Sequence, residues 1–193
     1  CERFKKTAKN VFFLTIQYLA IIMNVKENIK TLIVNKPLKL DCGQTINEFP
    51  LAYETYGSLN KDKNNAILVF HALTGDQFVT GKNPITNKDG WWSYAVGPNK
   101  SIDTNKYFVM CANVIGGCMG SFGPSHKNPK TNKSYGTDFP VITINDIVNA
   151  QVNLLDHFGI RKLFSVIGGS MGGMQVLQFV SNFPDKTKTA VPI

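Results

Sequence analysis

The chain contains very little arginine: Arg3 and Arg161 are the only two among 21 basic residues, and all the others are lysine. The formal net charge of +8 would suit a nucleic-acid-binding protein. However, the lysines are scattered, and no stretch combines arginine with aromatic residues along a phosphate-binding stripe. The 19 asparagines accompany the lysines, as expected of a genome rich in A-containing codons. We therefore expect a solvated lysine surface and no nucleic-acid partner.

Metal-ligating residues are also scarce. The chain has four cysteines and three histidines, with no CxxC pair and no cysteine–histidine group at zinc-binding spacing. Cys111 lies within an apolar run and is expected to be a buried thiol. Nothing in this pattern requires an oxidising compartment. We expect a cytoplasmic protein without a metal or a resident cofactor.

Long hydrophobic runs are absent as well. The most apolar stretch lies within residues 1–24, where a basic start precedes about thirteen mostly apolar residues. This stretch is too short to span a bilayer as a helix, and no small-x-small cleavage site follows it. We expect residues 1–22 to be an extension translated from upstream of a start at Met23, with a signal-like segment as the alternative. No membrane partner is expected.

What the sequence does contain is a globular core. Hydrophobic residues make up 43% of the 193 residues and charged residues 18%, which suits one domain over residues 31–193. The alternating residues of 31–40 and 49–57 predict two strands joined by a hairpin. Continuous apolar runs predict strands buried on both faces of a parallel sheet. These runs are residues 66–73, 106–115 and 162–168, and "TAVPI" begins a further strand.

Two helices are expected between and after these strands. Residues 143–160 carry a broad apolar face and end at Gly159, and residues 174–183 are helical up to Pro184. The alternation of strands and helices predicts an α/β fold with a mostly parallel sheet and right-handed crossovers. Residues 116–140 form a long loop with five glycines and three prolines, a length typical of functional loops.

The most informative motif is Gly168-Gly169-Ser170-Met171-Gly172, which fits G-x-S-x-G between a buried strand and a helix. Such a turn forces the serine into strained backbone angles, and only very small residues fit two positions before and two positions after it. Gly168 and Gly172 occupy these positions, and Gly169 and Gly173 are expected to relieve the crowding further. Ser170 is therefore the candidate nucleophile, and the Met171 N–H at the helix N-terminus is a candidate oxyanion donor. A phosphate loop fits poorly because the P-loop and G-x-G-x-x-G spacings are missing. A plain turn with a chance serine is the other alternative.

A second oxyanion donor is expected from the loop that follows an earlier strand. "HALTGD", residues 71–76, occupies that place, and the Leu73 N–H is the candidate. His71 ends a buried strand, so we expect it to be a structural, hydrogen-bonded histidine rather than a catalytic one.

The general base that Ser170 needs is not evident. His126 and His157 both precede the motif, whereas this fold orders its triad as serine, acid, histidine. After Ser170 the chain offers only Asp185, which comes too early. We therefore expect the acid and histidine to lie beyond Ile193 and the chain to be truncated before them.

At these residues the sequence resembles the homoserine O-acetyltransferase family, α/β-hydrolase-fold enzymes of methionine biosynthesis. The resemblance covers residues 31–193, and "ANVIGGCMGS" and "GGSMGGMQ" are its most specific segments. The matching segments also include "LAYETYGSLN", "HALTGD", "GWW" and "YGTDFPVITINDIVNAQ". One departure is His126, where the family more often has serine.

The resemblance implies an α/β-hydrolase fold cut off before the lid and the last strands. It implies transfer of an acetyl group from acetyl-CoA, a substrate rather than a cofactor, to homoserine through acylated Ser170, by a homodimer when full length. Leu73 and Met171 would supply the oxyanion donors. A succinyl donor, a serine acceptor, a plain serine esterase and a non-catalytic fragment stay open as alternatives, and the fragment is expected to be nearly inactive alone.

Overall fold

The computed structural model describes residues 29–193, and the extension expected at residues 1–22 lies outside them. Six strands form one sheet in the order β1-β4-β8-β5-β9-β10. The strands are β1 (Thr31–Val34), β4 (Phe49–Tyr56), β8 (Phe108–Ala112), β5 (Ala66–Phe70), β9 (Leu163–Gly168) and β10 (Thr187–Pro192). The last four are mutually parallel, whereas β1 and β4 are antiparallel to their neighbours. The mostly parallel sheet predicted from the three apolar runs is confirmed.

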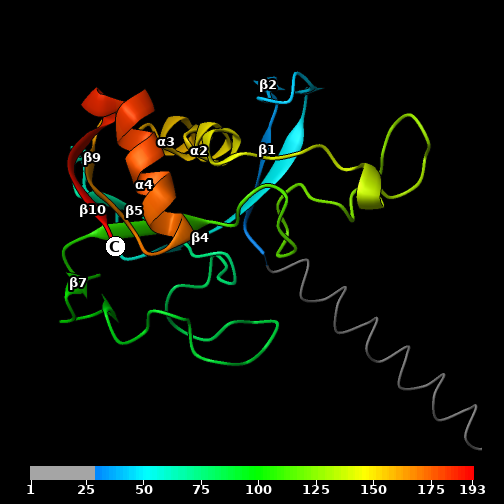
Figure 1. The fold of residues 1–193 in the computed structure, drawn as a ribbon. Coiled ribbons are helices and arrows are strands. Elements are labelled where there is room, and N and C mark those ends of the chain that lie inside the picture. Colours follow the sequence, from blue (N-terminus) through cyan, green and yellow to red (C-terminus); the bar gives the residue numbers. More distant parts are fainter. Residues whose placement is uncertain (1–28) are drawn as a thin grey trace, which may run out of the picture.

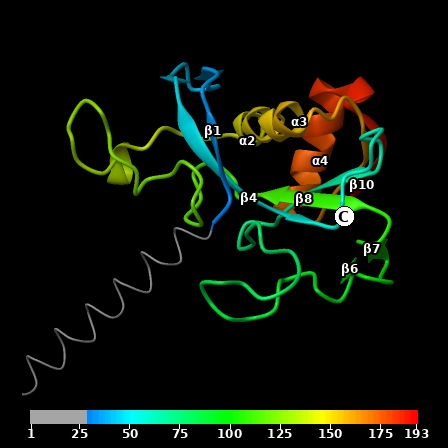
Figure 2. The same cartoon turned by 180° about the vertical axis from the view of Figure 1, so that it is seen from behind.

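The two faces of the sheet are covered differently. Helices α2 (Ile144–Gln151), α3 (Asn153–Phe158) and α4 (Met171–Asn182) lie together on one face, and the segment between β5 and β8 runs across the other (Figure 1, Figure 2). Alternate residues of β5 serve these two cores because successive side chains of a strand point to opposite faces. Leu68 packs with the helices, and Val69 packs with Trp91 and Trp92 on the loop face.

The N-terminal hairpin is more broken than the alternation predicted. The expected strand at residues 31–40 divides into β1 and the short β2 (Leu38–Lys39), which pairs with β3 (Thr45–Ile46) in a small separate sheet. Pro37 lacks an N–H and so cannot continue a ladder through this point. The segment between β5 and β8 contains one short parallel pair, β6 (Val96–Gly97) and β7 (Ile102–Asp103).

The helices also differ from their expected bounds. The single helix predicted over residues 143–160 is interrupted at Val152, where the Asn153 side chain donates to the carbonyls of Asn149 and Ala150 and competes with the helical backbone. Gly159 ends α3 in the left-handed conformation, as predicted. Helix α4 begins at Met171, three residues earlier than residue 174. Short 3₁₀ turns lie at Gly136–Asp138 and Pro184–Lys186.

Within the described part of the chain, no helix combines the length and the apolar character that crossing a membrane requires.

Candidate active site

Ser170 occupies a strained turn between β9 and α4. Its backbone angles are φ 56° and ψ −123°, a combination that non-glycine residues rarely adopt and that costs about 1–3 kcal/mol. The surrounding backbone enforces the turn: Gly172 N–H donates to Gly169 O at 2.8 Å, and Met174 N–H donates to Ser170 O at 3.1 Å. The Ser170 residue is exposed, so its hydroxyl is accessible from solvent. The predicted sharp turn with unfavourable angles is confirmed.

Two glycines of the motif are required by space. A Cβ on Gly172 would lie 2.2 Å from the Phe70 carbonyl oxygen, and one on Gly168 would lie 2.6 Å from the Gly172 backbone. Gly173 is also needed, because its Cβ would lie 2.7 Å from the Ile193 carbonyl oxygen. Gly169 is different: the nearest atom to its Cβ would be 3.9 Å away. The expectation that Gly169 relieves crowding at the turn is therefore wrong.

The candidate oxyanion loop follows the strand next to the turn. β5 pairs in parallel with β9, and Phe70 lies opposite Gly168 in the register. Because parallel strands end at the same edge of a sheet, residues 71–76 emerge beside Ser170. Among residues 29–193, neither the Leu73 nor the Met171 N–H donates to a protein acceptor. Both amides are thus available to an oxyanion, and their convergence on one point remains a prediction.

His71 is a buried, hydrogen-bonded histidine, as predicted. Its side chain is 1% exposed. Ring Nδ1 lies 2.7 Å from Ala72 O, and Nε2 lies 3.2 Å from the Val114 nitrogen, whose N–H is a donor. Burial lowers the pKa of His71 below its ordinary value, and the Ala72 carbonyl and the Asp76 charge oppose this shift. The neutral ring therefore connects the oxyanion loop to the end of β8.

Asp76 ends the same loop, and the sequence analysis assigned it no role. Its carboxylate accepts from the Phe78 N–H at 2.8 Å and from Asn83 Nδ2 at 2.9 Å. Burial raises the pKa of Asp76, and these hydrogen bonds and the nearby His71 oppose the shift. Asp76 O also accepts from Trp91 Nε1 at 2.9 Å. This carboxylate therefore fastens the loop to the segment that covers the sheet.

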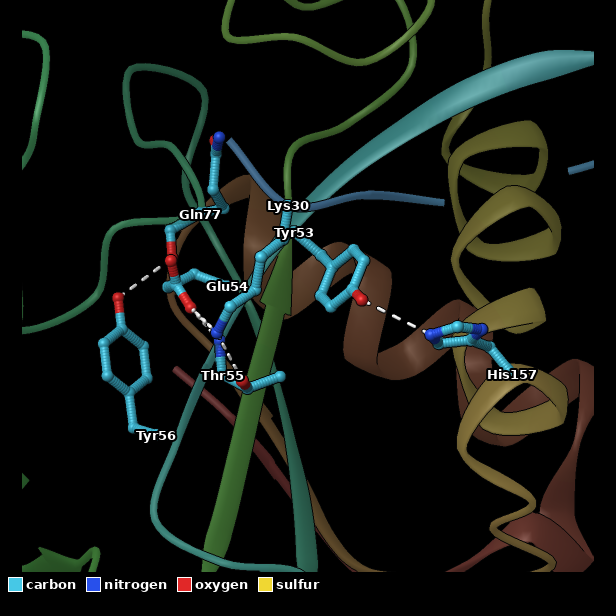
Figure 3. A network of polar contacts seen from close by, with 7 residues as sticks. All are labelled: Lys30, Tyr53, Glu54, Thr55, Tyr56, Gln77 and His157. Carbon is cyan, nitrogen blue, oxygen red and sulfur yellow. Dashed lines mark hydrogen bonds and ion pairs between the residues drawn. The ribbon is translucent and has the colours of Figure 1, made fainter. Parts of the chain in front are cut away.

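The loop is anchored to β4 as well. Tyr56 OH donates to Gln77 O at 3.3 Å (Figure 3). Gln77 Nε2 donates to Met119 O at 3.0 Å. Gln77 is fully buried, and its Oε1 has no hydrogen-bond partner among the described residues. The end of β5, the strand β4 and the loop that follows β8 are thus joined by polar contacts beneath the site.

A general base for Ser170 is not found among the described histidines. His126 Nδ1 accepts from the Gly123 N–H at 3.1 Å. His157, on α3, places its Nε2 3.3 Å from the OH of Tyr53 on β4 (Figure 3). Asp185 precedes β10, at the end of the sheet opposite Ser170. Within residues 29–193 the Ser170 side chain makes no capping hydrogen bond at the start of α4. In the same range no group of three or more His, Cys, Asp or Glu residues is arranged to hold a metal.

Gln175 is a polar residue of the site that the sequence analysis missed. It is fully buried on α4, and its Nε2 donates to His71 O at 3.1 Å. The sequence does indicate that Gln175 is buried, because it lies one position before Val176 and four before Phe179, on the apolar face of the helix. The pattern showed burial but gave no partner.

A strained, exposed serine between a parallel strand and a helix, with free amides beside it, is the nucleophile elbow of one large group of enzymes. The model of the alpha/beta hydrolase fold matches residues 65–191 of this chain. The chain belongs to the alpha/beta hydrolase fold family. The fold class predicted from the sequence is therefore confirmed.

The sequence is similar to those of curated acyltransferases of this fold. The chain is 75% identical over 171 residues to homoserine O-acetyltransferase of Pelagibacter ubique, covering 89% of this chain and 46% of that protein. It is 60% identical over 159 residues to the enzyme of the same name from Mesorhizobium japonicum, covering 82% and 41%. The chain thus spans less than half the length of these curated relatives.

Solved structures show the same arrangement with two different activities in their names. Homoserine O-acetyltransferase of Bacillus anthracis superimposes with a TM-score of 0.78 at 34% identity, over 84% of this chain and 45% of that chain. Esterase E22 superimposes with a TM-score of 0.77 at 34% identity, over 83% and 45%. These structures support the fold, and their names carry both activities.

Proposed function

We propose that the protein containing this chain transfers an acetyl group from acetyl-CoA to the hydroxyl of homoserine. The observation that carries the proposal is the enforced elbow at Ser170 in a chain 75% identical to a homoserine O-acetyltransferase. The chemistry needs no metal and no resident cofactor, because serine itself carries the acyl group between the two substrates. The product is an activated homoserine of methionine biosynthesis, and we place the reaction in the cytoplasm.

The reaction takes two steps. Ser170 Oγ attacks the thioester carbonyl, the C–S bond breaks, and coenzyme A leaves as the thiol with the serine proton. The homoserine hydroxyl then attacks the acetyl-serine carbonyl, the acyl–oxygen bond to Ser170 breaks, and the homoserine proton returns to Oγ. Each step passes through an oxyanion that the Leu73 and Met171 amides stabilise. Removing one such donor typically lowers the rate on the order of a hundredfold or more.

The experiment follows the acyl-enzyme directly in the full-length protein. Exposure to acetyl-CoA without homoserine should add one acetyl group to Ser170, detected by peptide mass spectrometry. Ser170→Ala should lose both this adduct and the turnover. An acetyl group on another residue, or full turnover by the alanine variant, would mean that the serine is only part of a turn.

The alternative, a serine esterase, is supported by the equal structural similarity to esterase E22. The two functions differ in what removes the acetyl group from Ser170. An acetyltransferase passes it to homoserine faster than to water, whereas an esterase releases acetate at the same rate with or without homoserine. Parallel assays with succinyl-CoA and with serine identify the donor and the acceptor, and mass photometry tests the predicted homodimer.

A further inference from the structure

The peptide group between Ala72 and Leu73 is held from its carbonyl side. Ala72 O accepts from the Gly75 N–H at 2.9 Å and lies 2.7 Å from His71 Nδ1. In a planar trans peptide the carbonyl and the following N–H point in opposite directions. The two contacts that fix Ala72 O therefore also fix the direction of the Leu73 N–H.

The protonation pattern of the His71 ring follows from its two partners. Val114 N–H is a donor, so the Nε2 that it faces must be an unprotonated acceptor. Ala72 O is an acceptor, so Nδ1 must carry the proton. Asn113 Nδ2 lies 3.4 Å from Nε2 and is also a donor, which favours the same tautomer. Only the neutral Nδ1–H ring satisfies every contact.

The preceding peptide group is held by Gln175. Its Nε2 donates to His71 O at 3.1 Å and to Met171 O at 3.3 Å, so two carbonyl oxygens face this end of the amide. Its Oε1 accepts from Gln151 Nε2 of α2 at 2.8 Å. The reverse orientation of the Gln175 amide would place an oxygen against two carbonyls. The amide is therefore oriented by α2, α4 and the end of β5 together.

We propose that His71 and Gln175 are positioning residues that aim the Leu73 N–H at the oxyanion formed on Ser170. Each residue fixes one of two consecutive peptide carbonyls, and the Leu73 amide is the next group along the chain. Both side chains are buried, so they act through the backbone and do not contact the substrate. The proposal rests on the function proposed above in taking Leu73 as an oxyanion donor.

Two substitutions at position 71 separate its two hydrogen bonds. His71→Asn places an amide nitrogen near the position of Nδ1 and retains the donor to Ala72 O. His71→Gln places an amide oxygen near the position of Nε2 and retains the acceptor for the Val114 N–H but loses that donor. At position 175, Gln175→Met preserves length without a donor. Gln178→Met is the matched control on the same helix, because the Gln178 amide donates to Asn182 at 2.8 Å and not toward the oxyanion loop.

The readout is the pre-steady-state acylation of Ser170 by p-nitrophenyl acetate in the full-length protein, which needs neither coenzyme A nor homoserine. We expect His71→Gln and Gln175→Met to lower the acylation rate about a hundredfold with KM little changed, as for loss of an oxyanion donor. The acylation rates of His71→Asn and Gln178→Met should stay within about tenfold of the parent rate. This change is clearly smaller than the roughly hundredfold loss expected when an oxyanion donor is lost. Thermal unfolding of each variant shows whether the rates merely follow stability.

The two proposals can fail separately. If Ser170→Ala is acylated as fast as the parent, the serine is not the nucleophile and the proposed function fails. If Ser170 is acylated but His71→Asn and His71→Gln react at equal rates, the positioning role is wrong and the proposed function stands. Should His71→Gln fail to fold, ¹⁵N-NMR of the parent decides: a proton on Nε2 instead of Nδ1 overturns the proposal.

Discussion

The backbone of Ile193 forms two hydrogen bonds with the elbow, one to Ser170 and one to Gly168. Its carbonyl accepts from the Ser170 N–H at 2.8 Å, and its N–H donates to Gly168 O at 2.9 Å. These bonds continue the parallel pairing of β10 with β9 past the end of both strands. A residue in the left-handed region persists only where its surroundings over-determine it, and this pair of bonds supplies part of that constraint.

Replacing Ile193 with proline should therefore disturb the nucleophile. Ile193→Pro removes the N–H that donates to Gly168 O, and a lost hydrogen bond of about 1 kcal/mol corresponds to roughly a fivefold slower acylation of Ser170. Ile193→Ala is the control, because it keeps the backbone bonds and removes a side chain that is 68% exposed. Labelling rates with a fluorophosphonate probe give the comparison. Equal rates for both variants would show that β10 does not support the elbow.

The glycines of the motif should differ sharply in their tolerance of a methyl group. Gly172→Ala forces a Cβ against the Phe70 carbonyl and should lower the free energy of unfolding by about 2–3 kcal/mol or more. Gly169→Ala places its Cβ at ordinary van der Waals distance from Ile193 and at a position without a positive φ, so it should be neutral or stabilising by up to about 1 kcal/mol. Urea denaturation measures both. A large loss in Gly169→Ala would contradict the geometry of the turn.

Stability should fall as the solution becomes more acidic than the ordinary pKa of histidine. The pKa of His71 is lowered in the folded protein, so below about pH 6.5 the unfolded chain binds a proton that the folded one does not. Its contribution is complete above pH 6.5 and is lost as the pH falls through the folded value, with a slope of at most about 1.4 kcal/mol per pH unit. Asp76, with its raised pKa, acts in the opposite direction at lower pH.

Urea denaturation at pH 8, 6.5 and 5.5 tests this dependence. The variant His71→Asn cannot titrate in this range and should lose the corresponding part of the slope. An unchanged slope in His71→Asn would assign the acid sensitivity to other groups.

The start of α2 should be sensitive to loss of its cap. Thr143 Oγ1 accepts from the Asp146 N–H at 3.2 Å, and the Asp146 carboxylate accepts from the Thr143 N–H at 2.9 Å. Asp146 also accepts from the Asp41 N–H, which ties the β2 region to the helix. Thr143→Ala should cost about 1 kcal/mol in the free energy of unfolding. Thr131→Ala, in an exposed loop, should change it by less than about 0.5 kcal/mol, and denaturant titration compares them.

The parts predictable from sequence were those set by local pattern. The strands β5, β8 and β9 are predictable because strands buried on both faces of a sheet are continuously apolar. Ser170 is predictable because the elbow requires small residues at fixed offsets from the serine. Gln175 could be recognised as buried but not assigned, because its partner His71 lies 104 residues away. A side chain fits at Gly169 and not at Gly173 because of where Ile193, the residue after β10, lies against the turn. The spacing of residues within the motif does not predict that position.

The strand order also bears on how the site arises during synthesis. One edge of β5 pairs with β8, which the ribosome synthesises soon after β5. The other edge pairs with β9, which is synthesised much later. Roughly 90 residues separate the end of β5 from the start of β9, so at about 5–20 residues per second the ribosome needs roughly 5–20 s to deliver the second partner. Throughout that interval His71 lacks the Gln175 amide, and the edge of β5 is open to other chains. A nascent chain stalled before residue 163 should therefore be a good client for chaperones that bind exposed strands.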